Sequence, residues 1–398
     1  MGIGFGLAGV AARVTSYRPG YGQGMSDAGT DATQERAIGA LYGVALGDAM
    51  GTPGELWSRR RIREHFGRIE DFLPAPDRPL PGGLRPGQVT DDTQQTVMLA
   101  RSVLRCGGRV EVADLARELL AWADRLGEAE SLLGPSSSRA FAALRAGADP
   151  GDTGVAGTSN GAAMRVVPLG LLCPSGDLEA LVAEVEASCA IAHLTGPAIA
   201  GAAMVAAAVS AALDEAVPAA EAEGKQADGA EAGPVETGGA EAIERILTVA
   251  LRAGEIGEVR GLDVAGPSVV ARARLAISIA RQARRTRQQE DAFLDELSAL
   301  LGAGVETSES VPAALALVVH AHGRPRRAAV LAANLGGDTD TVGAIAAGIC
   351  GALSGIRAIP PGDLATLRAV NGLELETLAS GLLAFRAQRA QRLRLGWE

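Results

Sequence analysis

The segment that most constrains the fold is residues 341–355, TVGAIAAGICGALSG. Small residues recur there every four positions from Gly343 to Gly355, so one face of a helix built from this segment has almost no side-chain bulk. Residues 342–353 carry no charge, which predicts a helix that is apolar on every side and therefore buried. Because small residues let another backbone approach closely, we expect this helix to lie at the centre of the molecule.

The rest of the chain also favours helices. Hydrophobic residues make up 47% of the 398 positions, while aromatic residues make up only 3% and Ala and Gly are abundant, a composition that suits packed helices better than strands. No segment shows the alternation expected of a strand. The sequence therefore predicts an all-α fold, with helices at residues 35–50, 90–104, 110–126, 162–172, 177–213, 241–254, 266–288, 290–302, 311–322, 325–334 and 341–355.

The domain organisation follows from composition. Residues 1–31 form the expected tail, disordered or non-native, because the first 24 positions are Gly-rich and Met25 opens a more ordinary polar start. Residues 32–398 are predicted to form a single domain. It is interrupted at about 214–241 by an acidic, low-complexity insertion that lacks large apolar residues.

Charge and cysteine usage exclude several classes of protein. The formal net charge of −10 argues against a nucleic-acid partner, and the arginines at 59–61 and 272–287 are interpreted as solvated helix faces. Residues 196–213 carry no charge but are mostly Ala and Gly, which indicates a buried helix rather than a membrane span. The four cysteines lie far apart, as small core residues of a reducing compartment do, so we expect a cytoplasmic protein.

Two short acidic segments are the candidates for chemistry. Residues 90–93 (TDDT) and 336–341 (GGDTDT) each place two carboxylates and a hydroxyl at the start of an apolar helix. Asp and Thr are also favoured as helix caps, so each motif taken alone is as well explained as a cap. A cap, however, needs only one such residue.

Taken together, the two segments predict a metal site. Both precede buried helices, so their four carboxylates can converge, and two such charges ~5 Å apart repel by roughly 3 kcal/mol at an effective dielectric constant of ~20. Divalent cations relieve this repulsion, and hard oxygen ligands without nearby Cys or His pairs favour Mg²⁺ or Mn²⁺ over Zn²⁺. Four carboxylates match two ions in charge, and a pair of ions ~3.5–4 Å apart can orient a water and polarise a substrate oxygen.

These segments belong to an ordered series of motifs over about residues 36–357. The series is GVALGDAMG at 43–51 with Glu55, TDDT at 90–93, SNGAAMR at 159–165, PLG at 168–170, His193, ESVP at 309–312, and NLGGDTDT at 334–341. In this order and spacing the chain resembles the ADP-ribosylglycohydrolases. The resemblance implies an orthogonal helical bundle with a central, buried binuclear site for two Mg²⁺ or Mn²⁺ ions, whose ligands are Thr90, Asp91, Asp92, Asp338, Asp340 and Thr341.

The resemblance also implies roles for other residues. The metals hold the ribose hydroxyls beside the scissile C1′ bond, Glu55 lies on a mobile loop that contacts a metal or gates the site, and Asp92 or Asp340 assists proton movement. The substrate-binding residues match Ser159, Asn160, Gly161 and His193, next to the diphosphate. Asp48 is interpreted as a structural partner of backbone N–H groups, and Glu309 as a first-turn helix charge or a support for the ligands.

We therefore expect a hydrolase that cleaves the glycosidic bond at C1′ of an ADP-ribosyl group, with ADP-ribosyl-arginine on a protein as the favoured substrate. The alternatives are a ribosyl or nucleoside-type hydrolase acting on a small molecule, and a non-catalytic protein that binds ADP-ribose. Thr158 stands where some relatives carry an aromatic residue, so the sequence indicates no side chain on which adenine would stack.

Overall fold

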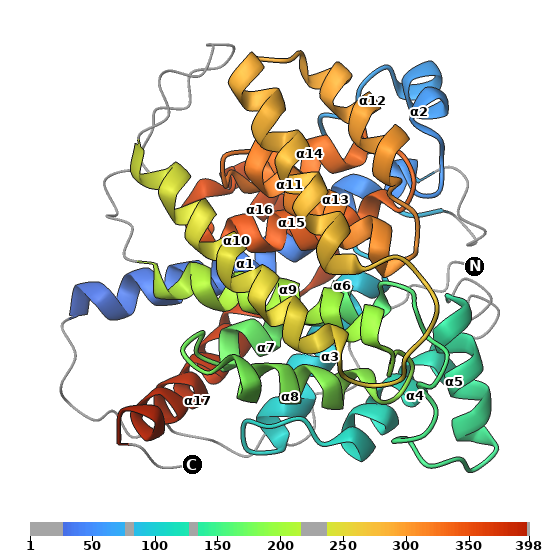
Figure 1. The fold of residues 1–398 in the computed structure, drawn as a ribbon, viewed down its shortest axis with the longest axis vertical. Coiled ribbons are helices and arrows are strands. Elements are labelled where there is room, and N and C mark those ends of the chain that lie inside the picture. Colours follow the sequence, from blue (N-terminus) through green and yellow to red (C-terminus); the bar gives the residue numbers. More distant parts are fainter. Residues whose placement is uncertain (1–26, 76–82, 127–133, 216–236, 396–398) are drawn as a thin grey trace.

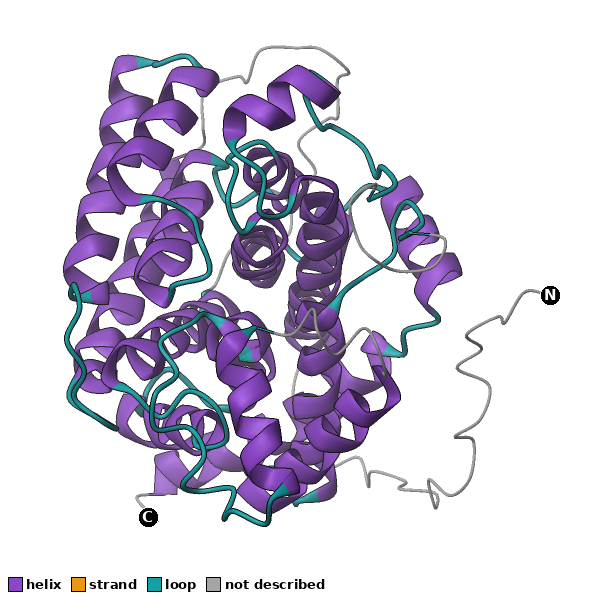
Figure 2. Ribbon diagram, turned by 90° about the vertical axis from the view of Figure 1, so that its right-hand side faces the viewer, coloured by secondary structure: helices purple, strands orange, loops and turns teal. Residues whose placement is uncertain are grey.

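The computed structural model describes residues 27–75, 83–126, 134–215 and 237–395, and within these ranges the chain is helical with only isolated β-bridges (Figures 1 and 2). The predicted all-α class is confirmed. The helices run in several directions: two central ones are seen nearly end-on in Figure 2, while those at its left edge run vertically. The α-helices are α1 (Asp27–Gly51), α2 (Arg59–Phe66), α3 (Asp91–Arg105), α4 (Val112–Leu126), α5 (Pro135–Arg145), α6 (Gly161–Arg165), α7 (Val167–Leu172), α8 (Leu178–Cys189), α9 (Gly196–Asp214), α10 (Thr237–Glu258), α11 (Val269–Thr286), α12 (Glu290–Leu301), α13 (Thr307–His320), α14 (Pro325–Ala333), α15 (Thr339–Ser354), α16 (Pro361–Asn371) and α17 (Leu375–Leu395).

The centre of the fold is an antiparallel pair formed by α1 and α15. Gly43 of α1 faces Ala347 of α15, and Gly47, one turn further along α1, faces Gly343, one turn earlier in α15. A Cβ atom added to Gly47 would lie 2.0 Å from the carbonyl oxygen of Gly343, so the two backbones are in direct contact. The small-residue face of 341–355 thus packs against another helix, as predicted. That helix is α1, whose own small residues repeat at the same interval of four.

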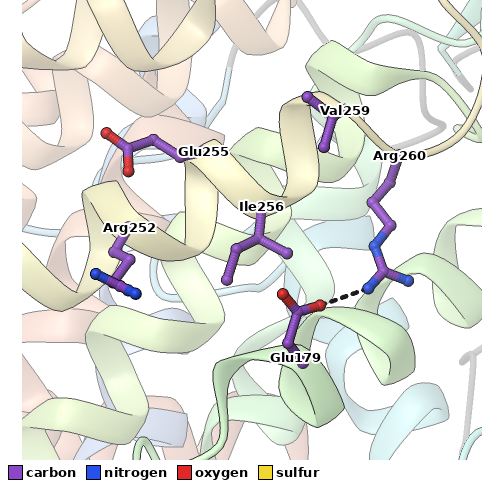
Figure 3. A pocket seen from close by; sticks show the side chains of 6 residues that line it. All are labelled: Glu179, Arg252, Glu255, Ile256, Val259 and Arg260. Carbon is purple, nitrogen blue, oxygen red and sulfur yellow. Dashed lines mark hydrogen bonds and ion pairs between the residues drawn. The ribbon is translucent and has the colours of Figure 1, made fainter.

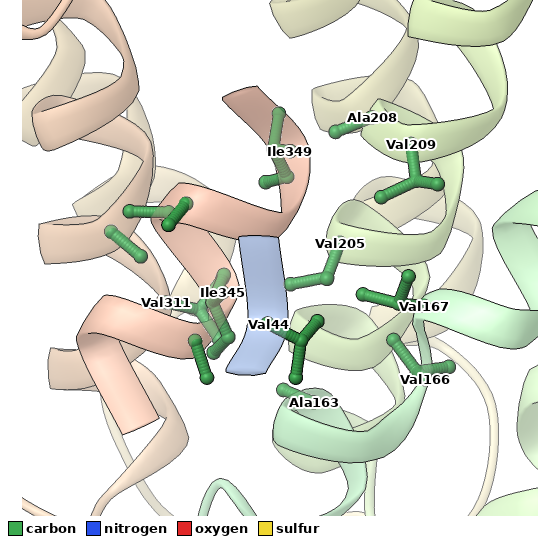
Figure 4. Packing of buried hydrophobic residues seen from close by; sticks show 14 of the residues in the cluster. Val44, Ala163, Val166, Val167, Val205, Ala208, Val209, Val311, Ile345 and Ile349 are labelled. Atoms are coloured by element: carbon green, nitrogen blue, oxygen red, sulfur yellow. The ribbon is translucent and has the colours of Figure 1, made fainter. Parts of the chain in front are cut away.

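Other helices close around this pair. Figure 4 shows Val44 of α1 between Ile345 of α15 on one side and Val167 of α7 and Val205 of α9 on the other. Helix α9 is long and apolar enough to cross a membrane by length and composition alone, yet 94% of its apolar window is buried inside the protein, as in the core helix predicted for this segment.

The observed helices differ from the predicted ones at proline and loop positions. Residues 162–172 form two helices because Pro168 lies in the first turn of α7, where its missing N–H group is tolerated. Residues 177–213 form the helices α8 and α9, in agreement with the helices expected there. The prediction took residues 59–61 as a helix face but gave no bounds for α2, and it missed α5, α16 and α17. Helix α1 begins at Asp27 rather than at residue 35.

The predicted tail and the predicted acidic insertion are not tested. Most of the tail (residues 1–26) and of the insertion (216–236) lies outside the described residues, so both stay predictions.

The interpretation of residues 59–61 as a solvated face is wrong for Arg59, which is 6% exposed. Its guanidinium donates to the Asp295 carboxylate at 2.7 Å and also to the Asn334 carbonyl oxygen, so it joins α2 to α12 and to the end of α14.

Candidate metal and active site

The two acidic segments meet where α1 ends and α15 begins. Asp340, in the first turn of α15, belongs to two groups of carboxylates. One potential ligand oxygen from each of Asp48, Asp92 and Asp340 lies within 4.8 Å of the others, and the same holds for Glu55, Asp338 and Asp340. The close contact of α1 with α15 creates this arrangement, because it brings the last turn of one helix against the first turn of the other.

Asp48 organises the start of α3. Its carboxylate accepts hydrogen bonds from the backbone N–H groups of Thr90 and Thr93, at 3.0 and 3.1 Å, and from the hydroxyl groups of both residues, at 2.9 and 2.5 Å. Thr90 is the N-cap residue of α3, but its own side chain caps nothing, so Asp48 replaces it from another helix. The structural role predicted for Asp48 therefore places it inside the cluster.

Glu55 is carried by a hydrogen-bonded turn. The N–H group of Trp57 donates to the Gly54 carbonyl oxygen at 3.0 Å. Two further bonds join the turn to Gly337: the Leu56 N–H group donates to the Gly337 carbonyl oxygen at 2.7 Å, and the Gly337 N–H group donates to the Trp57 carbonyl oxygen at 2.8 Å. Gly337 has φ 84°, and a Cβ there would overlap the Ala303 carbonyl oxygen. The structure thus places Glu55 on a hydrogen-bonded turn beside Asp338, and the mobility that the resemblance implies for this segment stays a prediction.

Burial makes the ionised cluster costly. The pKa values of Asp92 and Asp338 lie well above the ordinary range, first because the carboxyls are buried and then because Asp340 is close. Burial likewise raises the pKa of Asp48 to about 7. Two charges 4.8 Å apart repel by roughly 3 kcal/mol at an effective dielectric constant of ~20. Without a cation, several of these groups must hold a proton.

One buried atom points directly to a missing partner. Oδ1 of Asp92 is inaccessible to solvent and accepts no hydrogen bond from any described residue. No described residue forms an ion pair with Asp48, Asp92 or Asp338 either. A buried carboxylate oxygen without a donor is rare in native proteins. The donor set is entirely oxygen, so the residues present fit a hard divalent cation.

The predicted substrate-binding residues divide into two groups. Asn160 reaches the cluster, because its Nδ2 donates to the Asp338 carboxylate at 2.6 Å. Ser159 turns away and contacts the hydroxyl of Ser136 and Nε2 of His193, each at 3.1 Å. Gly161 packs on the His193 ring, which a Cβ at that position would overlap. His193 is fully buried, and burial holds its pKa well below the ordinary value, so this imidazole is neutral.

Comparison with known proteins decides the family. The sequence profile described as ADP-ribosylglycohydrolase matches residues 29–392, nearly the whole chain. The chain belongs to the ADP-ribosylglycohydrolase family.

The chain is also similar to curated relatives and to a solved structure. The chain is 38% identical over 357 residues to an Escherichia coli K12 protein named "Uncharacterized protein YegU", a match covering 89% of this chain and 98% of that protein. It is 37% identical over 92 residues to the ADP-ribosyl-[dinitrogen reductase] glycohydrolase of Rhodospirillum rubrum, covering 22% of this chain and 28% of the relative. A solved "ADP-ribosylglycohydrolase-related protein complex" shares the fold, with a TM-score of 0.61, 24% identity, and 89% and 99% coverage of the two chains.

A surface hollow elsewhere in the protein does not compete with the acidic cluster. It has a volume of about 500 Å³ and lies between α8 and the end of α10 (Figure 3). Glu179 is exposed there and pairs with Arg260 at 2.6 Å, so its charge is already matched by an arginine. Paired, solvated carboxylates contribute little binding energy. The buried, unmatched carboxylates around Asp340 remain the stronger candidate site.

Sequence reasoning missed part of the surroundings of this site. Arg165, in the predicted SNGAAMR motif, is 1% exposed and donates to the side-chain oxygen of Gln95 at 3.0 Å, which supports α3 from beneath the cluster. Glu309 accepts a hydrogen bond from the Gly304 N–H group at 2.9 Å. This bond stabilises the segment that contains Ala303, whose carbonyl oxygen accepts a hydrogen bond from the N–H group of Asp338. The arginine at the end of the motif was the available signal.

Proposed function

We propose that this protein hydrolyses the glycosidic bond at C1′ of an ADP-ribosyl group, and that its favoured substrate is ADP-ribosyl-arginine on a protein. Family membership supports ADP-ribosyl hydrolysis in general. The single observation that carries the proposal is the convergence of carboxylates on Asp340, with one buried oxygen of Asp92 lacking any donor among the described residues.

The proposed cofactor is a pair of Mg²⁺ or Mn²⁺ ions. The residues proposed to hold them are Thr90, Asp91, Asp92, Asp338, Asp340 and Thr341, with Glu55 beside them on its turn. Bound there, such ions would supply positive charge that polarises the ribose hydroxyls and a water molecule. Two ions would also match the charge of the four aspartates in the two motifs.

The side chains of the chain itself would then divide the remaining work. Asp48 orients the Thr90 hydroxyl by accepting a hydrogen bond from it at 2.9 Å, which leaves the lone pairs of the hydroxyl oxygen free to face the cluster. Asn160 holds one oxygen of Asp338 in place. Asp92 or Asp340 is the proposed group that accepts and returns a proton. Meanwhile an oxocarbenium-like centre would develop at C1′.

The test is release of ADP-ribose from ADP-ribosylated arginine, with Mg²⁺ or Mn²⁺ and with a chelator. Metal-dependent release is expected from the wild type, and Asp338→Asn should abolish it and weaken metal binding by removing a charged ligand. Asp177→Asn is the matched control, because Asp177 caps α8 through the N–H group of Ala180 and belongs to neither carboxylate group found among the described residues. If the acidic motifs are only helix caps, the two variants will behave alike.

Other outcomes would favour other functions. ADP-ribose binding without release under any metal condition would identify a non-catalytic binder and overturn the enzymatic proposal. Release of a base from a nucleoside, with ADP-ribosyl-arginine left intact, would identify a small-molecule ribosyl hydrolase. Full activity of Asp338→Asn would refute the ligand assignment itself.

A further inference from the structure

The turn that carries Glu55 has an unusual residue at its third position. Glu55 has φ −55° and ψ 132°, Leu56 has φ 58°, and the Trp57 N–H group donates to the Gly54 carbonyl oxygen at 3.0 Å. These values describe a type II turn, whose third position requires a positive φ and normally holds Gly or Asn. A leucine in left-handed backbone is strained, because its Cβ approaches the following carbonyl oxygen.

The side chain of Leu56 does not compensate for this strain by packing. It is 65% exposed, whereas the next residue, Trp57, is 6% exposed and stacks on Phe66. The Leu56 N–H group is bound to the Gly337 carbonyl oxygen at 2.7 Å, one residue before Asp338. The backbone of Leu56 is therefore fixed against the loop that leads into the acidic cluster, while its apolar side chain faces solvent.

A single exposed leucine is ordinary, and a single positive φ can be tolerated. Both features at one residue are harder to explain by folding, because glycine would remove the strain and expose less apolar surface. Strain of this kind collects where function requires a particular side chain. Leu56 is the immediate neighbour of Glu55, which forms a carboxylate group with Asp338 and Asp340.

We propose that Leu56 is a specificity-determining residue, whose side chain contacts the aliphatic stem of the amino acid that carries the ADP-ribosyl group. The inference rests on the proposed function. In that reaction the ribose C1′ atom must reach the carboxylates, so the stem of the modified side chain runs outward from them to the substrate protein. An apolar side chain on the solvent side of Glu55 meets that stem, whereas the guanidinium and the ribose lie deeper.

The experiment compares two compounds that share the scissile bond and differ in the stem: ADP-ribosyl-arginine and ADP-ribosylguanidine. The test variants are Leu56→Asn, which introduces a polar residue that tolerates left-handed backbone, and Leu56→Gly, which removes both the side chain and the strain. The expected result is a loss of about fivefold or more in kcat/KM for ADP-ribosyl-arginine, mainly through KM, and a change below about twofold for ADP-ribosylguanidine. Leu275→Asn, at an exposed leucine of α11 (49% exposed), is the control and should change neither value.

The outcomes separate this proposal from the proposed function. If the wild type releases ADP-ribose but the variants keep its preference between the two compounds, Leu56 does not contact the stem. An equal loss with both compounds would mean that the turn only positions Glu55, which also overturns the proposal. Leu56→Gly with higher stability and unchanged kinetics would show that the leucine is merely tolerated. If the wild type acts on neither compound, the proposed function fails, and the role of Leu56 fails with it.

Discussion

Replacing Gly43 by alanine tests the contact on which the whole site depends. An added Cβ would lie 2.2 Å from the Ala347 carbonyl oxygen, which is 1.2 Å short of an ordinary contact of 3.4 Å. The obstacle is backbone, and α1 and α15 touch in the same way at Gly39, Gly47 and Gly51, so the helices cannot part at one point alone. Overpacking of this kind costs about 3 kcal/mol, and the better helix propensity of alanine returns about 1 kcal/mol. The expected net loss of unfolding free energy is therefore about 2 kcal/mol.

Urea unfolding measures this loss. We also expect a weaker metal affinity, because Asp48 and Asp340 move apart with their helices, and calorimetric titration with Mn²⁺ measures that affinity. The matched control is Gly362→Ala in α16, where an added Cβ meets nothing within 4 Å and the change should be neutral or slightly stabilising. A Gly43→Ala protein as stable as the wild type would refute the reasoning, because it would show that the two backbones are not in contact.

Three more predictions follow from the hydrogen bonds and charges. Asp48→Asn removes one of the oxygens that accept from Thr90 and Thr93, so unfolding free energy should fall by about 1–3 kcal/mol and metal affinity by about tenfold or more in calorimetry; unchanged affinity would exclude Asp48 as an organiser of the site. Burial raises the Asp48 pKa from 3.8 to about 7, so the folded, chelator-treated protein keeps a proton that the unfolded chain has lost. The contribution of this group to the free energy of unfolding should be greatest below pH 4 and should decline by roughly 4 kcal/mol in total up to pH 7. Urea unfolding midpoints can measure this decline, and added Mg²⁺ should reduce it. A free energy of unfolding that rises between pH 4 and pH 7 would contradict the burial of the cluster. Arg59→Met should lower the free energy of unfolding by about 1–3 kcal/mol and let the depressed pKa of Asp295 return toward its ordinary value, which carboxyl NMR titration can follow. An unchanged Asp295 pKa would show that the pair between Arg59 and Asp295 is absent.

Much of the fold was predictable from local pattern, and its central contact was predictable only in part. The uncharged small-residue face of 341–355 correctly indicates a buried helix that meets another backbone. It does not say which one, although Gly39, Gly43, Gly47 and Gly51 of α1 repeat at the same interval of four. The register that sets Gly47 against Gly343 depends on the whole interface, so periodicity in one segment cannot supply it.

The missed features have different physical reasons. Helix α2 is short and begins with three arginines, so its composition resembles a solvated face, and only tertiary contacts with Asp291 and Asp295 of α12 explain why Arg59 is buried. Helix α16 begins at Pro361, a common first-turn residue that the pattern analysis did not use. The convergence of Asp92 with Asp340 was anticipated from charge and motif order. The inclusion of Asp48 in the cluster was not anticipated. Five hydrogen bonds to its carboxylate come from Thr90 and Thr93, which are too distant in sequence for a local pattern to reveal them.

The central claim is that the carboxylates around Asp340 form a metal site. Calorimetric titration of chelator-treated protein with Mn²⁺ and Mg²⁺, beside Asp92→Asn and Asp177→Asn, tests it most directly. The account predicts binding of two ions per wild-type chain with release of protons, since carboxyls that hold protons without metal must lose them on binding. It predicts weakened or absent binding for Asp92→Asn and wild-type binding for Asp177→Asn. Equal binding by all three proteins, or none by the wild type, would contradict it.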